Sequence, residues 1–308
     1  MTLIPRIAVV GSANVDLTFR TPRLPTPGET LTGHSFHLGM GGKGANQAVV
    51  AARLGAQVSF VACIGSDPFG HEALRCYKNE GIDTTFVRAD EQLPTGTAAI
   101  IVDDLPENCI IVVSGANAGL SPKDVSEASA AIQDADALLC QLETPLDATL
   151  AAFRLARAAS VRTVLTPAPS TELPDELLRL CDLCVPNKSE IETLVGRKVE
   201  SHADAESAAK VLRKRGVGTV VVTMGSRGAH LFDKDGATHV PAVSVEAVDP
   251  TGAGDAFAAA LAVYLAVGLP LRDAARRASV VAALTVTRIG TQAAFPSLAE
   301  VNERLAAE

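Results

Sequence analysis

Between Ser121 and Thr223, short apolar runs alternate with longer segments of helical periodicity, and this alternation constrains the fold more than any other feature. The runs predict strands at residues 137–142, 161–165, 183–185 and 219–223. The segments between them predict helices at residues 121–135, 146–159, 172–180, 189–195 and 203–215. Alternating strands and helices form parallel sheets with both faces covered. We therefore expect an α/β fold of three layers, with helices flanking a mostly parallel central sheet.

The remaining segments extend this pattern and interrupt it twice. Further strands are expected at residues 7–10 and 58–64, and further helices at residues 43–54, 69–80, 256–267, 271–287 and 297–306. Two sections with lower apolar density, at about residues 16–39 and 95–113, contain strand-like pieces near 30–38, 96–102 and 109–113. We interpret them as insertions that form a small β-sheet lid on a single domain, residues 1–308.

Composition excludes several classes of partner and compartment. The chain has 308 residues, is 47% hydrophobic and carries a formal charge of −8, which disfavours nucleic acid and anionic membranes as partners. No apolar stretch is long enough to cross a membrane, and the start lacks the regions of a signal peptide, so a cytoplasmic protein is expected. The six cysteines are scattered, and the only close pair, Cys181 and Cys184, has no second pair to complete a zinc site.

Residues 249–257 form the segment with the clearest chemical character. Gly252 and Gly254 precede an apolar run that predicts a buried helix, so their backbone N–H groups lie at a helix N-terminus, where anions bind. Asp255 falls in the first turn of that helix. It has two interpretations: a helix cap, or a general base beside an anion site that accepts the proton of an attacking hydroxyl.

Other polar residues follow the predicted strands, where ligands bind in open parallel sheets. They are Asn14, Asp16, Glu143, Asn187, Thr223 and Gly225. Each has an ordinary alternative: Asn14 and Asp16 as turn residues, Glu143 as a solvated acid, and Asn187 as a helix cap paired with Glu190. Their concentration at one edge of one sheet favours a binding site.

Residues 39–44 match the pattern GxGxxG and raise the alternative of a dinucleotide site. The segment before them is polar rather than a buried strand, which is atypical of that motif. The sequence also contains no Walker A pattern. A nucleotide-using protein with this sequence would therefore not be a P-loop protein.

Several blocks together resemble the ribokinase-like carbohydrate kinase family of the phosphofructokinase-B type. The matching blocks are residues 11–16, 25–30 and 41–48 with Gly55 and Gly65 beyond, Asn187 with Glu190, and residues 249–255. They occur in order over essentially the whole chain. The resemblance implies an ATP-dependent kinase that phosphorylates the 5-hydroxyl of D-ribose. A 2-deoxyribose or nucleoside kinase is the alternative within the family, and a non-catalytic sugar-binding sensor, which would not need Asp255, is the alternative from another class.

The resemblance also implies a role for each matching residue. Asp255 is expected to be the catalytic base, and the N–H groups of Gly252, Ala253 and Gly254 to form an anion hole for the γ-phosphate. The positions implied to hold the sugar are Asn14, Asp16, Gly42, Lys43, Asn46, Glu143 and Asp255. For Lys43, whose ordinary alternative is an exposed lysine, the backbone between two glycines is expected to matter more than the ammonium group.

Cofactor positions follow in the same way. Asn187 and Glu190 are expected to organise Mg²⁺ and phosphates through water, and the nucleotide loop is expected to contain Thr223, Gly225, Ser226 and Gly228, with Gly254 beside it. An activating K⁺ is expected among Asp249, Thr251, Thr285, Arg288 and Gly290. Ala294 and Ser279 depart from the residues common in the family near the cation and the adenine. A homodimer that forms through the lid is also expected.

Overall fold

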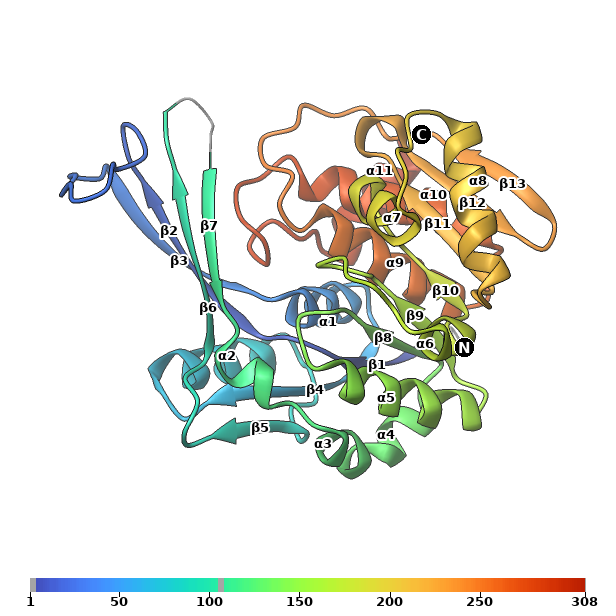
Figure 1. Ribbon diagram of the computed structural model, residues 1–308, viewed down its shortest axis with the longest axis horizontal. Coiled ribbons are helices and arrows are strands. Elements are labelled where there is room, and N and C mark those ends of the chain that lie inside the picture. Colours follow the sequence, from blue (N-terminus) through green and yellow to red (C-terminus); the bar gives the residue numbers. More distant parts are fainter. Residues whose placement is uncertain (1–3, 105–107, 308) are drawn as a thin grey trace.

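The computed structural model describes residues 4–104 and 108–307, and its centre is a nine-stranded sheet (Figure 1). In spatial order the strands are β13 (Gly236–Val240), β12 (Ala229–Asp233), β11 (Thr219–Thr223), β10 (Leu183–Cys184), β9 (Arg162–Leu165), β8 (Ala137–Cys140), β1 (Arg6–Val10), β4 (Gln57–Gly65) and β5 (Val87–Asp90). Neighbours are parallel from β5 to β11, while β12 pairs antiparallel with β11 and with β13. The predicted mostly parallel central sheet is confirmed.

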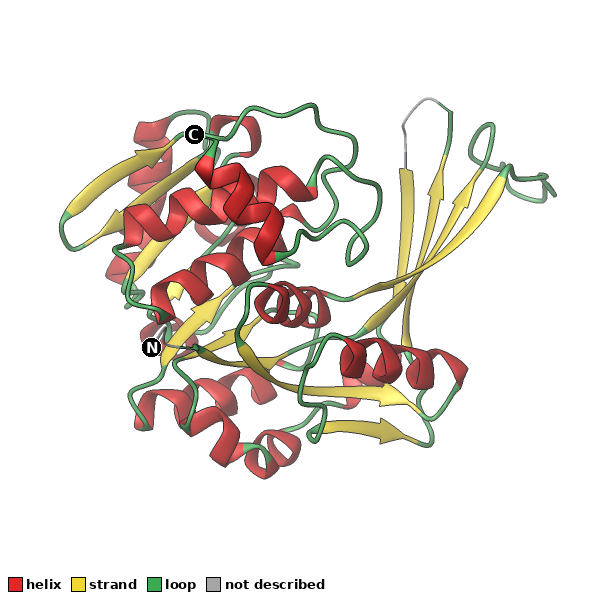
Figure 2. Ribbon diagram, turned by 180° about the vertical axis from the view of Figure 1, so that it is seen from behind, coloured by secondary structure: helices red, strands yellow, loops and turns green. Residues whose placement is uncertain are grey.

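Helices cover both faces of this sheet (Figure 2). Successive residues of a strand point to opposite faces, so Ile7 and Val9 pack into one apolar layer and Ala8 and Val10 into the other. The helices of the first layer are α1 (Lys43–Arg53), α2 (Pro68–Asn79), α9 (Ala253–Ala266), α10 (Leu271–Thr285) and α11 (Leu298–Ala306). Those of the second are α3 (Pro122–Glu127), α4 (Ser129–Gln133), α5 (Leu146–Ala158), α6 (Asp175–Leu180), α7 (Lys188–Val195) and α8 (His202–Lys214).

Helix α9 is the most deeply buried of the helices near the candidate site. Its residues from Asp255 to Tyr264 are all buried, and most of them are alanine or another small or aliphatic residue. Small side chains let the helix pack closely on α1 and on α10. The first turn of α9 is thereby held next to the start of α1, with Asp255 buried and Gly254 exposed. Within residues 4–104 and 108–307, none of the helices has the length and apolarity that crossing a membrane requires.

A second, smaller sheet stands away from the body of the molecule (Figure 1). Its strands are, in order, β3 (Ser35–Gly41), β2 (Asn14–Arg20), β6 (Gly96–Val102) and β7 (Asn108–Val113). The pair β2 and β6 is parallel, and the outer strands run antiparallel to them. These strands come from the two sections predicted as insertions, although residues 105–107 of the second section lie outside the described residues. In both views the sheet faces the loops that lead into α9 and follow α10 (Figures 1 and 2).

Some elements differ from the prediction. Asn14 and Asp16 are not turn residues after a strand: both belong to β2, whose polar and apolar residues alternate as expected for a half-exposed strand. The pattern did not predict β5, β12 or β13. The helix expected at residues 121–135 is divided into α3 and α4, because the chain turns at Ala128 (φ −88°, ψ 7°).

Candidate active site

Asp255 lies in the first turn of α9, and its side chain points toward α1. Its Oδ2 accepts a hydrogen bond from Asn46 Nδ2 at 3.0 Å, and its Oδ1 accepts one from Gln47 Nε2 at 3.3 Å. The N-cap of the helix is Gly252, and no side chain caps it. The interpretation of Asp255 as a helix cap is therefore wrong. The carboxylate is instead held by two amides of a neighbouring helix, with 7% of the residue exposed.

Burial and nearby charges set the protonation of this group. Burial raises the pKa of Asp255, and the negative charge of Glu143 adds to the rise, while the Lys43 ammonium and the hydrogen bonds from Asn46 and Gln47 oppose it. The net direction is upward. A carboxylate with a raised pKa is a better proton acceptor, which suits a general base.

Lys43 is not the exposed lysine of the ordinary alternative. The residue is partly buried at the start of α1, and although burial lowers its pKa, the charges of Asp255, Glu143 and Glu190 raise it overall. Its backbone N–H donates to Glu143 Oε2 at 3.0 Å. The ammonium group adds a positive charge shared by three carboxylates, which the sequence pattern did not reveal.

Backbone N–H groups are available where α9 begins. Gly252 has a left-handed conformation (φ 79°, ψ −6°), and a Cβ there would lie 3.0 Å from the Phe295 ring, so glycine is required on two grounds. Gly254 is exposed, and a Cβ built on it would meet no atom within 4 Å. The N–H of Ala253 is engaged in a long bond, 3.3 Å, to the carbonyl of Pro250. The open space beside Gly254 therefore offers the more accessible donors for an anion.

Asp16 and Asn14 approach this helix end from β2. Burial, with the negative charges of Glu143 and Asp255, raises the pKa of Asp16 to about 6, although a hydrogen bond from Thr291 opposes the rise. Its carboxylate fills the space beside Gly41, where a Cβ would lie 2.3 Å from Asp16 Oδ2. Asn14 Oδ1 accepts from Asn117 Nδ2 at 2.7 Å.

Glu143 connects three elements near the same point. It follows β8, and its Oε2 accepts from Ser12 Oγ at 2.5 Å and from the Lys43 N–H, so it ties the end of β1 to the start of α1. Gly44 N donates in turn to Ser12 Oγ at 3.3 Å. The loop therefore comes so close to β1 that a Cβ on Gly44 would lie 2.5 Å from Ser12 N.

Gly42 begins α1 in a conformation that only glycine adopts readily (φ 86°), and a Cβ there would lie 2.6 Å from Asn14 N. We expect Gly42→Ala to lower the free energy of unfolding by more than ~2 kcal/mol, because backbone strain and a backbone clash add. Gly81→Ala is the control: it has similar strain (φ 74°) but no atom within 4 Å, so it should cost only about 1 kcal/mol. Urea unfolding measures both, and equal losses would contradict the crowding at Gly42.

The residues predicted to bind the nucleotide and Mg²⁺ lie at or after the ends of β10 and β11. Asn187 and Glu190 form the capping box that was the ordinary alternative: Glu190 N donates to Asn187 Oδ1 at 2.9 Å, and Asn187 N to Glu190 Oε2 at 2.8 Å. Burial, together with the charge of Asp255, raises the pKa of Glu190 despite the opposing Lys43 charge. Glu190 therefore interacts with the charges of Asp255 and Lys43. We refer to Asp16, Lys43, Glu143, Glu190 and Asp255 as the charge cluster.

The predicted nucleotide loop begins at Thr223, which forms a bridge with Asn187. It continues through a short 3₁₀ turn, Gly225–Arg227, that contains Ser226, and Gly225 and Gly228 have positive φ angles of 57° and 81°. A Cβ on Gly228 would lie 2.1 Å from the Val240 carbonyl, so the loop packs closely on β13.

Asp249 joins the two segments predicted to hold a monovalent cation. Its Oδ1 accepts from Thr251 N at 2.9 Å and from Thr251 Oγ1 at 2.6 Å, and its Oδ2 accepts from Gly290 N at 2.9 Å. Thr285 is fully buried, and its carbonyl accepts from Arg288 N at 3.3 Å. Carboxylate and carbonyl oxygens are the donors that hard cations prefer, so the chemistry of this set fits K⁺.

The two departures from the family pattern are both buried. Ala294 is fully buried and can offer no side-chain oxygen to a cation. Ser279 donates its hydroxyl to the Ala275 carbonyl at 3.0 Å, within its own helix.

The sequence analysis did not predict four polar residues of the site, because only long-range contacts bring them there. They are Gln47, Asn117, Thr291 and Gln292. Gln292 Nε2 donates to Asn46 Oδ1 at 3.4 Å, and Thr291 Oγ1 donates to the Met40 carbonyl at 2.7 Å. Of these four residues, only Gln47 lies within the family motif at residues 41–48, so the motif could have indicated it.

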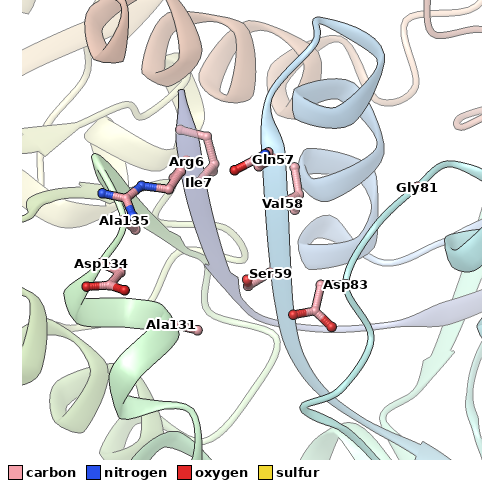
Figure 3. A pocket seen from close by; sticks show the side chains of 10 residues that line it. All are labelled: Arg6, Ile7, Gln57, Val58, Ser59, Gly81, Asp83, Ala131, Asp134 and Ala135. Atoms are coloured by element: carbon pink, nitrogen blue, oxygen red, sulfur yellow. The ribbon is translucent and has the colours of Figure 1, made fainter. Parts of the chain in front are cut away.

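A hollow of about 400 Å³ lies elsewhere, at the amino-terminal ends of the strands (Figure 3). Arg6 and Gln57, which begin β1 and β4, line it together with Asp83 and Asp134. None of its lining residues is a predicted site residue. Since the charge cluster lies at the opposite, carboxyl ends, this hollow is separate from the candidate active site.

The comparisons with known proteins agree with this geometry. A family model described as pfkB family carbohydrate kinase matches residues 5–298, nearly the whole chain. The chain belongs to the pfkB carbohydrate kinase family. The predicted family, the fold class and the general activity of an ATP-dependent sugar kinase are thus confirmed. Membership of this kinase family also leaves no support for the dinucleotide-site alternative.

Individual members of the family are similar over their full length. The ribokinase of Haemophilus influenzae is 41% identical over 299 residues, covering 97% of this chain and 98% of the relative. The deoxyribokinase of Salmonella typhi is 38% identical over 300 residues, with 97% and 98% covered. The structure of Arabidopsis thaliana ribokinase complexed with ribose and ATP has a TM-score of 0.92 and 31% identity, covering 98% of this chain and 99% of that chain.

Proposed function

We propose that this kinase transfers the γ-phosphoryl group of ATP to the 5-hydroxyl of D-ribose. One observation carries the proposal: a buried Asp255 carboxylate at the head of α9 faces polar side chains of β2 across the start of α1. The relatives support the choice of ribose, because two of those compared, from Haemophilus influenzae and Arabidopsis thaliana, are ribokinases, and the latter was solved with ribose and ATP.

In the proposed reaction Asp255 accepts the proton of the 5-hydroxyl as that oxygen forms a bond to the γ-phosphorus. The bond between the γ-phosphorus and the bridging oxygen breaks, and ADP leaves with the electron pair. The N–H groups of Gly252, Ala253 and Gly254 stabilise the negative charge of the transferring group. The positive charge of Lys43, already shared with Asp255 and Glu190, favours the same anion.

The sugar is held by the polar residues on the other side of the base. Asp16, Asn14, Asn46, Glu143 and the glycine-flanked loop at Gly42 offer carboxylate, amide and backbone groups, which bind vicinal hydroxyls through paired hydrogen bonds. We assign Asp16 the largest share, because its carboxylate is partly buried close to those of Glu143 and Asp255.

Two cations fit the residues present. Glu190 and Asn187 would hold Mg²⁺ through water, since their direct oxygens are engaged in the cap; the ion would neutralise phosphate charge. Asp249 and the carbonyls of Thr251, Thr285, Arg288 and Gly290 would hold K⁺ beside the anion hole, with Ala294 contributing nothing. Thr223, Gly225, Ser226 and Gly228 would bind the nucleotide.

The smaller sheet is proposed as a lid that closes over the sugar and excludes water. Its apolar residues include Phe36, Ile110, Ile111 and Val112, with exposed fractions of 52–59%. Exposed apolar strands at a sheet edge favour pairing with another chain, so we propose a homodimer formed through the lid. A cytoplasmic location accords with a substrate and a nucleotide that occur inside cells.

An ADP-release assay with ribose, 2-deoxyribose, fructose and adenosine, each with and without Mg²⁺ and K⁺, tests the proposal. Ribose should give the highest kcat/KM. A preference for 2-deoxyribose would instead favour the relationship to the deoxyribokinase. Binding of ribose by calorimetry without ADP release would indicate the sensor, and overturn the kinase.

The protonation of Asp16 predicts how sugar binding depends on pH. Because its pKa is raised to about 6, the group loses its charge as the pH falls through 6, and with it a strong acceptor for sugar hydroxyls. We expect KM for ribose to rise up to about tenfold per pH unit below 6, while KM for ATP changes little. Asp16→Asn should have a high KM that no longer varies with pH in this range. A KM for ribose that stays constant from pH 5 to 8 in the unmodified enzyme would contradict the assignment.

A further inference from the structure

Gln47 occupies an environment that polar side chains rarely enter. It lies on α1 with no exposed surface, between residues of the apolar layer such as Ala45 and Ala48. Polar groups buried in this way require hydrogen-bond partners, and an apolar residue at this helix position would avoid that requirement. The partners of its amide therefore indicate what the residue contributes.

Both N–H groups and the oxygen of this side-chain amide form hydrogen bonds. Its Nε2 donates to Asp255 Oδ1 at 3.3 Å and to Thr166 Oγ1 at 3.0 Å, and its Oε1 accepts from Gln141 Nε2 at 2.6 Å. Gln141 and Thr166 directly follow β8 and β9, adjacent strands of the central sheet. Two strand ends therefore fix the orientation of one glutamine so that its NH₂ group faces Asp255.

The opposite carboxylate oxygen has its own partner. Asn46 Nδ2 donates to Asp255 Oδ2, so consecutive residues of α1 supply one amide donor to each oxygen. Such an arrangement fixes the plane of the carboxylate. The donors also stabilise its ionised form, opposing the effect of burial on the pKa of Asp255.

We propose that Gln47 is a positioning residue. It holds the catalytic base, Asp255, in its ionised form and in a fixed orientation. The proposal rests on the role of Asp255 in the proposed function. Gln47 has no exposed surface and donates to Asp255 Oδ1, so it acts on the sugar only through Asp255. Asn46, by contrast, was predicted from the family to contact the sugar itself.

Gln47→Met tests this role, since methionine keeps the volume of the side chain and removes both donors. The acidic limb of the kcat profile should move upward by about one pH unit, which lowers kcat about tenfold on the acidic side, because the ionised base has lost a hydrogen bond. KM for ATP should stay within about twofold. Gln47→Glu, which brings a like charge to Asp255, should move the limb at least as far.

Thr163→Val is the matched control for lost stability. This buried hydroxyl lies on β9 away from the site, where it donates to the Leu180 carbonyl at 2.6 Å and accepts from Asp182 N at 2.9 Å. The Thr163→Val substitution should lower the melting temperature without shifting the pH profile of kcat. A Gln47→Met enzyme that has the unmodified profile, or a Thr163→Val enzyme that shifts equally, overturns the proposal.

The two proposals can fail separately. If Asp255→Asn retains full activity, the function proposed for Asp255 fails whatever Gln47 does. If Asp255→Asn is inactive and both Gln47 variants keep the unmodified pH profile, only the role of Gln47 fails.

Discussion

Asp255→Asn is expected to lower kcat by about 10²–10⁴ while the protein remains folded. Asparagine keeps the size of the side chain but cannot accept the proton of the sugar hydroxyl at neutral pH. Asp255 caps no helix, and its burial disfavours a charge, but the new NH₂ group would face one of the two amide donors, so the free energy of unfolding should fall by about 1–3 kcal/mol. Steady-state kinetics and urea unfolding, measured on the same preparation, separate the two effects.

The control is a carboxylate of the same type outside the site. Asp235→Asn, on the exposed hairpin between β12 and β13, should leave kcat within about twofold. An Asp255→Asn enzyme whose kcat lies within tenfold of the unmodified value would exclude Asp255 as the base, and with it the proposed mechanism. Loss of activity with loss of the cooperative unfolding transition would show a structural role instead.

The alternation of apolar runs and helices was sufficient to predict the inner parallel strands of the central sheet, which are β1, β4, β8, β9, β10 and β11. These inner strands are largely buried on both faces and therefore appear as short continuous apolar runs, as at residues 219–223, whereas the edge strand β5 is partly exposed and was not predicted. Strand β2 was missed for the opposite reason: it is half exposed, and its residues Asn14 and Asp16 resemble turn residues when considered singly. Burial made the inner strands easy to predict, but it was not sufficient, since β12 is also buried and was missed.

The candidate site was predictable where its residues share a motif, and not where they meet only through the fold. Gly252 and Asp255 are three positions apart on one helix start. Gln47 meets Asp255 across 208 positions of sequence, and Thr291 meets Asp16 across 275. No local pattern encodes such contacts. The charge shared by Lys43 was also hidden, because it depends on carboxylates from three separate elements.

Asp16→Ala is expected to raise KM for ribose by about 10²-fold or more, and to leave KM for ATP within about threefold. A hydrogen bond to a charged group contributes roughly 1.5–3 kcal/mol, and a carboxylate that binds two vicinal hydroxyls would lose two such bonds. The effect should fall on the sugar alone, because Asp16 lies on β2, whereas the predicted nucleotide residues follow β10 and β11.

The test depends on comparing the change in KM for ribose with the change in KM for ATP. Asp235→Ala removes an exposed carboxylate of the same charge and should leave both KM values unchanged. Equal increases in KM for ribose and for ATP after Asp16→Ala would mean that the substitution disturbs the site as a whole. In that case the neighbouring Gly41 and Thr291, which contact the Asp16 carboxylate, would have lost their support, and the assignment of Asp16 to the sugar would be wrong.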